Sequence, residues 1–557
     1  MAHADGTSDD RALLTGSPIY RAMVGADVPS ELFDSTEPAV SAPAKRSMEK
    51  CLAVARMHVA AGTVHDADGI VAPKVMADLA DAGYWGLRVG AEYGGSGASL
   101  AAWAPFVAEM ATIDVSVAGL SSPHAALGPV NLVGTFGNDE QKHRLLPLLA
   151  RGERLGAFAI TEPGTASDWG ALRTTAVRDG DRILLTGEKM FISNALPGRA
   201  VAVLCNLEDR LTMLIVELPS SESERFRTVR YRVRAPAHVD NRGLVFHDLP
   251  VPVANAFDAD GRRVAYHGLN HGRVLVCAFA AGALRTMAAT LIPWVQTRET
   301  FGATIGTREL VQRRLGRLAA RIVACDAMIA WSSQLLDQGY RGELECVTTK
   351  VFGSEAMKEG AVDLLLKTHA SRSFLPGNVF SDALYDLLAP TVFEGENEIL
   401  TLGSFSSLAK ARLRAAASRT PGEAEHGGLA AAASKDLAVA AGDVLRESGD
   451  DVDDALRRHG PELAARQAFA VEVAQRIQQA TVMLVVSRYA MRQIDPLVRD
   501  AAVCMAAELQ QRLFGNRPTA EYHQLLTAVG AAVAEERFAP VVDVARAAVV
   551  MPEHLAR

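Results

Sequence analysis

The chain has few aromatic residues and only six, widely scattered cysteines. Aromatic residues make up 6% of the 557 residues, while alanine is abundant, and this composition favours helices over sheets. The spacing of the cysteines argues against a zinc site and against a secreted disulfide framework. We therefore expect reduced thiols, most of them filling the core, and no metal site. The six are Cys51, Cys205, Cys277, Cys325, Cys346 and Cys504.

Long apolar runs and an excess of positive charge are also missing. No stretch approaches twenty uninterrupted apolar residues, and residues 1–20 show no signal-peptide pattern. The net charge is −8 and the sequence pI is near 6.0, which does not favour nucleic acid as a partner. The expectation is a cytoplasmic protein without a transmembrane segment.

The chain is long enough for several domains, and the pattern of apolar residues changes along the sequence. Apolar residues at helical spacing dominate on both sides of a central region of short β-branched runs, such as Ala200–Cys205 and Leu211–Val216. Asn138, with Gln141 three residues later, has the chemistry of a helix start. The predicted plan is a flexible arm (1–45), a helical domain (46–157), a β domain (158–265), a helical bundle (266–414), a linker (415–428) and a helical extension (429–557).

The run Thr391-Val-Phe-Glu-Gly-Glu-Asn-Glu-Ile-Leu400 contains a candidate catalytic base, Glu394. Apolar neighbours raise the pKa of a carboxyl group, and Gly395 would let a substrate approach closely. By itself the signal is weak, because most glutamates in helical regions are solvated surface residues.

Three further segments strengthen the signal for a catalytic base at Glu394. They are Phe158–Asp168 with its Thr-Glu-Pro-Gly-Thr turn, Gly187–Asn194, and Arg298–Gly302. Their order and separations resemble the acyl-CoA dehydrogenase family over roughly residues 46–410. The helical extension makes the chain most similar to the longer, very-long-chain type members. The resemblance implies a mainly α fold with a central β domain: an N-terminal helical domain, an antiparallel β domain, a four-helix domain and a C-terminal helical domain.

The resemblance also implies an activity. It predicts a flavin-dependent oxidoreductase that uses FAD for α,β-dehydrogenation of an acyl thioester, either acyl-CoA or an acyl group on a carrier protein. Glu394 would be the base, electron-transfer flavoprotein or oxygen the acceptor, and the assembly a homodimer. The alternatives are a flavin monooxygenase of the same fold, and a non-catalytic relative that binds flavin or nucleic acid.

By the same resemblance, Arg273 and Gly395 are expected to contact the substrate. The Arg298 segment is expected to reach the FAD of the neighbouring subunit. The expected cofactor-binding residues are Phe158, Ile160, Thr161, Ser167, Phe191, Ser193, Arg298, Phe301, Gln312 and Glu396.

Two departures from the family pattern affect this expectation. Where the family has a Gly-Gly-x-Gly turn near the ADP portion of the flavin, this chain has Ala370-Ser-Arg-Ser-Phe374 without glycine. Each added Cβ stands where backbone should approach phosphate, although Arg372 could compensate with charge. Glu396 replaces the family's threonine, and it either faces the base, raising one pKa by repulsion, or faces solvent.

Overall fold

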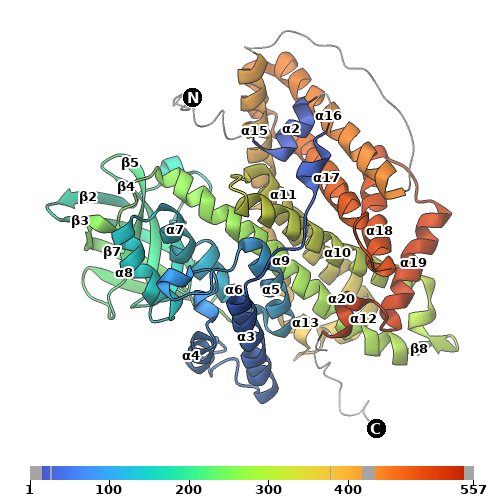
Figure 1. Ribbon diagram of the computed structural model, residues 1–557, viewed down its shortest axis with the longest axis horizontal. Helices are drawn as coiled ribbons and strands as arrows, with labels where there is room; N and C mark the ends of the chain where they lie inside the picture. Colours follow the sequence, from blue (N-terminus) through green and yellow to red (C-terminus); the bar gives the residue numbers. More distant parts are fainter. Residues whose placement is uncertain (1–15, 26–27, 377, 417–432, 545–557) are drawn as a thin grey trace. The chain divides into compact units, whose positions relative to one another are not determined.

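The computed structural model describes residues 16–25, 28–376, 378–416 and 433–544. They form two compact units (Figure 1). The β unit is Pro38–Gly282, and the helical unit is Met1–Glu37 together with Ala283–Arg557. The long helix α9 (Gly261–Thr297) begins in the β unit and continues into the helical unit.

The β unit opens with helices whose starts are specified by side-chain caps. Asn138 and Gln141 form the predicted capping box at the start of α8, each side chain bonding the other residue's backbone N–H. Ser99 caps α5 by a single bond, its side chain accepting from the N–H of Ala102. The elements are α3 (Ala42–Ala61), α4 (Pro73–Asp81), η2 (Tyr84–Gly86), η3 (Ala91–Tyr93), α5 (Leu100–Ile113), α6 (Val115–Ser121), η4 (Ser122–Ala126), α7 (Pro129–Phe136) and α8 (Asp139–Ala150).

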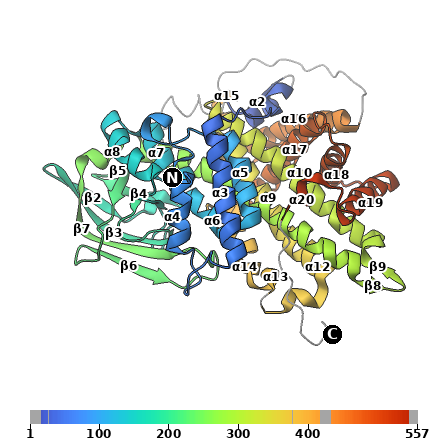
Figure 2. The same ribbon diagram turned by 60° about the horizontal axis from the view of Figure 1, so that its bottom comes forward.

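The sheet that follows has the strand order β1-β4-β2-β3-β7-β6, with β5 pairing β4 (Figure 2). Most pairs are antiparallel as predicted, but β4 runs parallel to both β1 and β2, so the sheet is mixed. Alternate residues of β4 and β7 bury their side chains in one core. The elements are β1 (Gly156–Ala159), η5 (Trp169–Ala171), β2 (Thr175–Asp179), β3 (Arg182–Ser193), β4 (Ala200–Leu207), β5 (Arg210–Glu217), β6 (Phe226–Tyr231), β7 (Asn241–Pro252) and η6 (Val253–Asn255).

The helical unit is built on the end of α9 and two further long helices, α10 and α11. Among the described residues α9 alone is long and apolar enough to cross a membrane, and 78% of its apolar window is buried, as expected of a core helix. The other elements are β8 (Glu299–Thr300), β9 (Ala303–Thr304), η7 (Ile305–Thr307), α10 (Glu309–Asp337), α11 (Glu343–Glu359), η8 (Gly360–Leu365), α12 (Leu366–His369), η9 (Ala370–Phe374), α13 (Val379–Asp382), α14 (Leu384–Leu388), η10 (Ala389–Thr391) and α15 (Asn397–Ala416).

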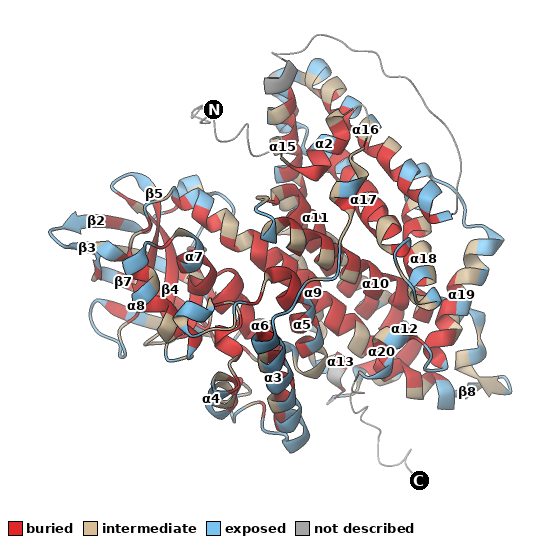
Figure 3. Ribbon diagram, viewed as in Figure 1, coloured by how far each residue is buried: buried red, intermediate tan, exposed pale blue. Residues whose placement is uncertain are grey.

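The extension packs on this bundle, with buried faces on α10 and α17 and exposed residues along α16 and α19 (Figure 3). Glycines allow the closest approach: a Cβ at Gly316 of α10 would lie 2.1 Å from the Leu526 carbonyl oxygen of α19. A Cβ at Gly530 would lie 1.8 Å from the Gln312 carbonyl oxygen. The elements are α16 (Ala433–His459), η11 (Gly460–Ala465), α17 (Gln467–Ala490), α18 (Pro496–Phe514), α19 (Ala520–Ala534) and α20 (Ala539–Val542). Most of the predicted linker 415–428 lies outside the described residues.

The prediction of a flexible arm over residues 1–45 is wrong for the described residues 17–25 and 28–36. Helix α2 (Pro18–Val24) and the turn η1 (Ser30–Phe33) are docked on the helical unit. Phe33 stacks on Trp331 with ring centroids 5.6 Å apart, and the Trp331 indole donates to the Leu32 carbonyl at 2.8 Å. A few buried apolar side chains among Pro, Ser and Gly are enough to fix this segment, and residues 1–15 lie outside the description.

Candidate active site

In the β unit, the first two predicted flavin segments lie side by side. The Met190 N–H donates to the Thr161 carbonyl at 2.9 Å. Beside this bond the Lys189 ammonium donates to the Glu162 carboxylate at 2.7 Å and to the Ile160 carbonyl at 2.9 Å. Both charged side chains are almost fully buried, at 0% and 2% exposure. This pair therefore fixes Phe158–Glu162 against Gly187–Phe191.

The pKa of Glu162 is lowered despite its burial. Burial raises it, but the hydrogen bond from Lys189 and the N–H groups of Arg173 and Thr174, at 2.6 and 3.0 Å, outweigh that effect. An ionised carboxylate that accepts several hydrogen bonds is the arrangement that makes a buried ion pair tolerable. Sequence reasoning missed this pair. The available signal was a lysine inside a predicted strand and a glutamate directly after the run Phe158–Thr161.

Phe191 points outward because β3 is bulged at that position. The pairing of β3 with β7 shifts register between Lys189 and Ile192, and Phe191 has a φ of 59°. Its side chain is 54% exposed, and its ring lies 5.1 Å from that of Tyr231. Ser193 follows, half-buried, and accepts a long hydrogen bond of 3.4 Å from Asn241. The bulge thus presents an aromatic face and, two residues on, a hydroxyl.

The Thr161–Asp168 segment is a tight turn. The backbones of Glu162 and Thr165 bond each other at 2.9 and 3.1 Å, and Gly164 takes a φ of 90°. Ser167 is exposed and Thr161 is half-buried. By contrast the Ile160 side chain is buried, which leaves its backbone as the part able to meet a cofactor. Phe158 is half-buried.

Arg273 lies in a buried polar cluster on the β-unit part of α9. Its guanidinium donates to the Asn270 side chain at 2.9 Å, and the residue is 3% exposed. The neighbouring His271 ring lies 4.5 Å from the His267 ring, and burial lowers the pKa of His271 well below its usual value. A contact between Arg273 and the substrate stays a prediction.

In the helical unit, two arginines from separate segments of the sequence both lie near the indole ring of Trp294. The guanidinium of Arg298, at the end of α9, lies 5.7 Å from the Trp294 ring, and that of Arg372, in η9, lies 4.1 Å from it. Burial, and then the charge of Arg298, lower the pKa of Arg372. Two neighbouring guanidinium groups form an attractive site for a pyrophosphate.

The hairpin after Arg298 projects an aromatic side chain. Phe301 and Gly302 form the two-residue turn between β8 and β9, both at positive φ, and Phe301 is 99% exposed. Gln312 in α10 donates to the Gly306 carbonyl at 3.1 Å. The cofactor roles of Phe301 and Gln312 stay predictions.

The loop that lacks the family's glycines keeps a glycine-like backbone. Ala370 has φ 55° and ψ −140°, a region that alanine rarely enters. The segment then forms the 3₁₀ turn η9, which carries Arg372 to Trp294. Ala370 therefore takes a strained conformation that is typical of glycine, and the loop adds the guanidinium of Arg372.

Glu394 occupies a second strained turn. Its φ is 56°, and Gly395 follows at φ 101°, where a Cβ would lie 2.6 Å from a methyl of Leu400. The Glu394 side chain is half-buried. Glu396 instead caps α15, accepting from the N–H groups of Glu398 and Ile399 at 3.1 and 3.0 Å. The sequence predicts a Glu396 side chain that faces either the base or solvent, and it does not predict this cap of α15. The predicted cofactor role of Glu396 stays a prediction.

These surfaces fit FAD. The β unit offers an outward aromatic ring and hydroxyl side chains that are exposed or half-buried, beside a tight turn. The helical unit offers two neighbouring guanidinium groups for phosphates. FAD requires an apolar or aromatic contact for its ring system and positive charge for its pyrophosphate. In the β unit the Thr161 and Phe191 segments are adjacent, and in the helical unit Arg298 and Arg372 both lie near Trp294.

Comparison with known proteins agrees with the fold and the motifs. Three models of the acyl-CoA dehydrogenase family match: the N-terminal domain at residues 47–153, the middle domain at 157–242 and the C-terminal domain at 259–403. An acyl-CoA dehydrogenase of Bacillus subtilis (strain 168) is 29% identical over 330 residues, covering 58% of this chain and 85% of the relative. The very long-chain specific acyl-CoA dehydrogenase of Homo sapiens is 29% identical over 359 residues. That match covers 61% of this chain and 53% of the human protein, so it spans about half of that relative.

One solved structure extends the likeness to the extension. An acyl-CoA dehydrogenase complexed with FAD from Bacillus anthracis has a TM-score of 0.72 at 20% identity, over 94% of this chain and 98% of that one. The prolyl acyl carrier protein oxidase AnaB gives a TM-score of 0.60 at 20% identity, over 66% of this chain and 100% of that one. At these identities the structural likeness concerns the fold.

The fold, the motif segments and the three matching domain models define one class of protein. This chain belongs to the acyl-CoA dehydrogenase family, whose members are FAD-dependent oxidoreductases.

Proposed function

We propose that this chain removes hydrogen from the α and β carbons of an acyl thioester, with Glu394 as the base. The observation that carries the proposal is the turn at Glu394, where two consecutive positive-φ residues hold a half-buried carboxylate at the start of α15. Strained backbone of this kind concentrates at functional sites. The rival reaction, flavin monooxygenation, does not require a carboxylate base.

The Glu394 carboxylate accepts the proton from Cα, and the electron pair of that C–H bond forms the new C=C bond. FAD, when bound, would supply the two-electron acceptor for the hydride that leaves Cβ. A carboxylate positioned within hydrogen-bond reach of Cα can act as the general base for this proton transfer. Backbone N–H groups near the base are suited to polarise the thioester carbonyl.

The rest of the predicted site is proposed in the same terms. Thr161, Ser167, Phe191 and Ser193 would contact the flavin from the β unit. Arg298, with the added charge of Arg372, would bind phosphates of FAD held by a second copy, which implies a homodimer. The substrate carrier, CoA or carrier protein, and the acceptor, electron-transfer flavoprotein or oxygen, stay open, and a cytoplasmic location stays a prediction for cell fractionation.

The test is anaerobic spectroscopy of the purified flavoprotein with a panel of acyl thioesters. Bleaching of the flavin absorbance by at least one thioester is expected, and Glu394→Gln should abolish it while flavin content is retained. Glutamine is isosteric but cannot accept the proton. If the glutamine variant bleaches within a few-fold of the wild-type rate, Glu394 is not the base, and if no thioester bleaches the wild type, the reaction class is wrong.

A further inference from the structure

Helix α11 holds the Glu394 turn through a buried lysine that no sequence motif predicted. Lys350 is fully buried, and its ammonium donates to the Gly395 carbonyl at 2.6 Å and to the Asn397 side-chain oxygen at 2.8 Å. These two acceptors stand on either side of Glu396, directly after the base. One ammonium therefore bridges the turn and the first residue of α15.

Asn397 extends this contact into a network along α11. Its amide nitrogen donates to Ser354 at 3.1 Å and to the Glu355 carboxylate at 2.7 Å. Ser354 in turn donates to the Lys350 carbonyl at 2.9 Å, one helical turn away. Since Lys350 and Ser354 lie four residues apart, they share one face of α11.

The turn needs such support because its backbone is unfavourable. Glu394 at φ 56° has a Cβ that disfavours this conformation, and positive-φ residues of this kind persist only when their surroundings fix them. A buried ammonium is also costly unless it is hydrogen-bonded, and two charge-assisted bonds of 2.6 and 2.8 Å supply that. The strained turn and the buried ammonium are each unfavourable alone, and the hydrogen bonds between them stabilise both.

We infer that Lys350 is the positioning residue for the base: it holds the Glu394–Gly395 turn in the conformation from which the carboxylate reaches the substrate Cα. This inference rests on the proposed function of Glu394. Proton transfer requires reacting atoms within hydrogen-bond reach, and a misplacement of about 1 Å can cost about 100-fold in rate. Lys350 itself has no proton-transfer role.

The decisive variant is Lys350→Met, which keeps an unbranched side chain and removes the ammonium. Its matched control is Lys410→Met, at an exposed lysine of α15. The FAD-loaded proteins are mixed anaerobically with an acyl thioester that bleaches the wild type, unlabelled or deuterated at Cα. The expected result for Lys350→Met is a reductive rate about 100-fold lower with substrate affinity changed less than three-fold. A larger Cα deuterium isotope effect should accompany it, because proton abstraction becomes more limiting.

Hydrogen exchange provides a readout that does not depend on catalysis. Backbone amides of residues 392–397 should exchange faster in Lys350→Met than in Lys410→Met, while the sheet amides of the β unit stay unchanged. If both the rate and the exchange match the control, Lys350 does not position the base. A loss of rate together with unchanged exchange also overturns the inference, because the turn would then be held without the lysine.

Two outcomes remain distinguishable from these. If no thioester bleaches the wild type, the proposed function fails, and the exchange at 392–397 still reports whether Lys350 holds the turn. If Lys350→Met does not fold, Asn397→Ala removes one of the two acceptors, and a rate about 10-fold lower is expected from the loss of one charge-assisted bond. An Asn397→Ala protein with wild-type rate and exchange would contradict the inference.

Discussion

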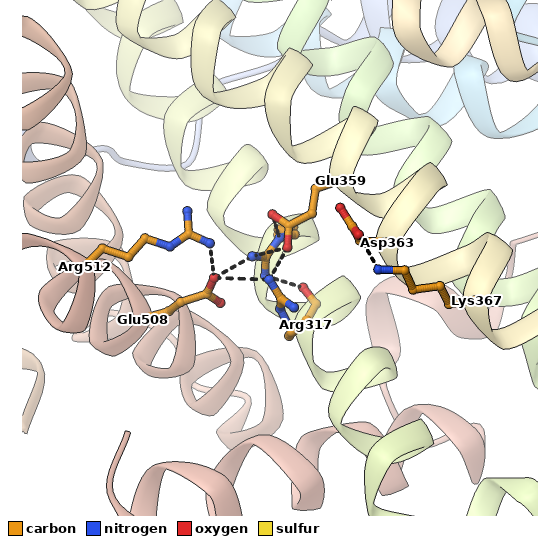
Figure 4. A network of polar contacts seen from close by, with 7 residues as sticks. Arg317, Glu359, Asp363, Lys367, Glu508 and Arg512 are labelled. Carbon is orange, nitrogen blue, oxygen red and sulfur yellow. Dashed lines mark hydrogen bonds and ion pairs between the residues drawn. The ribbon is translucent and has the colours of Figure 1, made fainter. Parts of the chain in front are cut away.

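The extension should depend on one buried ion network for its attachment to the helical unit. The Arg321 guanidinium of α10 is 1% exposed and lies 2.7 Å from the Glu508 carboxylate of α18 and 2.8 Å from the Glu359 carboxylate of α11. Arg317 and Arg512 complete the network, which Figure 4 shows between the three helices. Burial raises the pKa of Glu508, but the nearby guanidinium groups outweigh it and lower the pKa to about 2.

That pKa gives the size of the effect. One pH unit of difference between folded and unfolded pKa corresponds to about 1.4 kcal/mol, so a fall from 4.5 to about 2 stabilises the folded chain by about 3 kcal/mol. Glu508→Gln should remove this amount at neutral pH, since it leaves the buried Arg321 with one carboxylate. Because the folded pKa is depressed, the stabilisation is complete above about pH 4.5 and is lost as the pH falls toward 2.

Hydrogen exchange of the α18 amides measures the loss of local stability in Glu508→Gln. A local measurement is needed because a chain of several domains does not unfold in two states. At pH 7 the slowest α18 amides of Glu508→Gln should exchange about 100-fold faster than in wild type. The control is Glu472→Gln, at an exposed glutamate of α17. Denaturation midpoints of wild type and Glu508→Gln should converge below about pH 4.5. Equal exchange in Glu508→Gln and the control at pH 7 would refute the reasoning.

Three further substitutions test other strained or charged positions. Ala370→Gly should stabilise the protein by about 1 kcal/mol in thermal denaturation, because glycine accepts φ 55° and ψ −140° without strain, and a loss of stability would contradict this. Arg298→Ala should weaken FAD binding by about 10-fold or more in titrations and shift light scattering toward monomer, whereas tight FAD binding by a monomer would oppose it. Gly395→Ala should slow flavin reduction and cost about 1–3 kcal/mol, given φ 101° and the close Leu400 methyl, and an unaffected enzyme would show that the turn can adapt.

The sequence was most informative where local chemistry decides the structure. The capping pair Asn138 and Gln141, and the β-branched runs of β4 and β5, specify their elements without distant partners, and they were found as predicted. The family motifs placed Phe191 on a strand, but only pairing with β7 creates the bulge that turns its ring outward. Long-range pairing of this kind is not readable from one strand.

Residues that act through distant contacts were missed for the same reason. Lys350 stands in an ordinary helical pattern, and its partners follow 45 and 47 residues later in the chain. Likewise, Phe33 lies in a polar stretch of the sequence, and the ring that buries it belongs to Trp331, 298 residues later. The hydrogen bond from Trp331 to the carbonyl of Leu32 spans 299 positions. A single sequence gives no signal for such pairs, so the segment Ser30–Phe33 was mistaken for part of a flexible arm.

Helix α11 contacts both the Glu394 turn and the ion network of the extension. The distance between these two contacts limits how strongly a change at one affects the other. Lys350 holds the Glu394 turn, and Glu359, nine residues on, holds Arg321 and through it α18. At about 1.5 Å per residue the two attachments lie about 13 Å apart along the helix, and the helix remains hydrogen-bonded between them. Glu508→Gln should therefore destabilise the attachment of α18 but leave the flavin reduction rate within about three-fold of wild type. Lys350→Met should do the opposite, slowing reduction about 100-fold with little change in α18 exchange. If the two variants slowed reduction equally, α11 would have to move as a rigid body, and the extension would then belong to the machinery that positions the base.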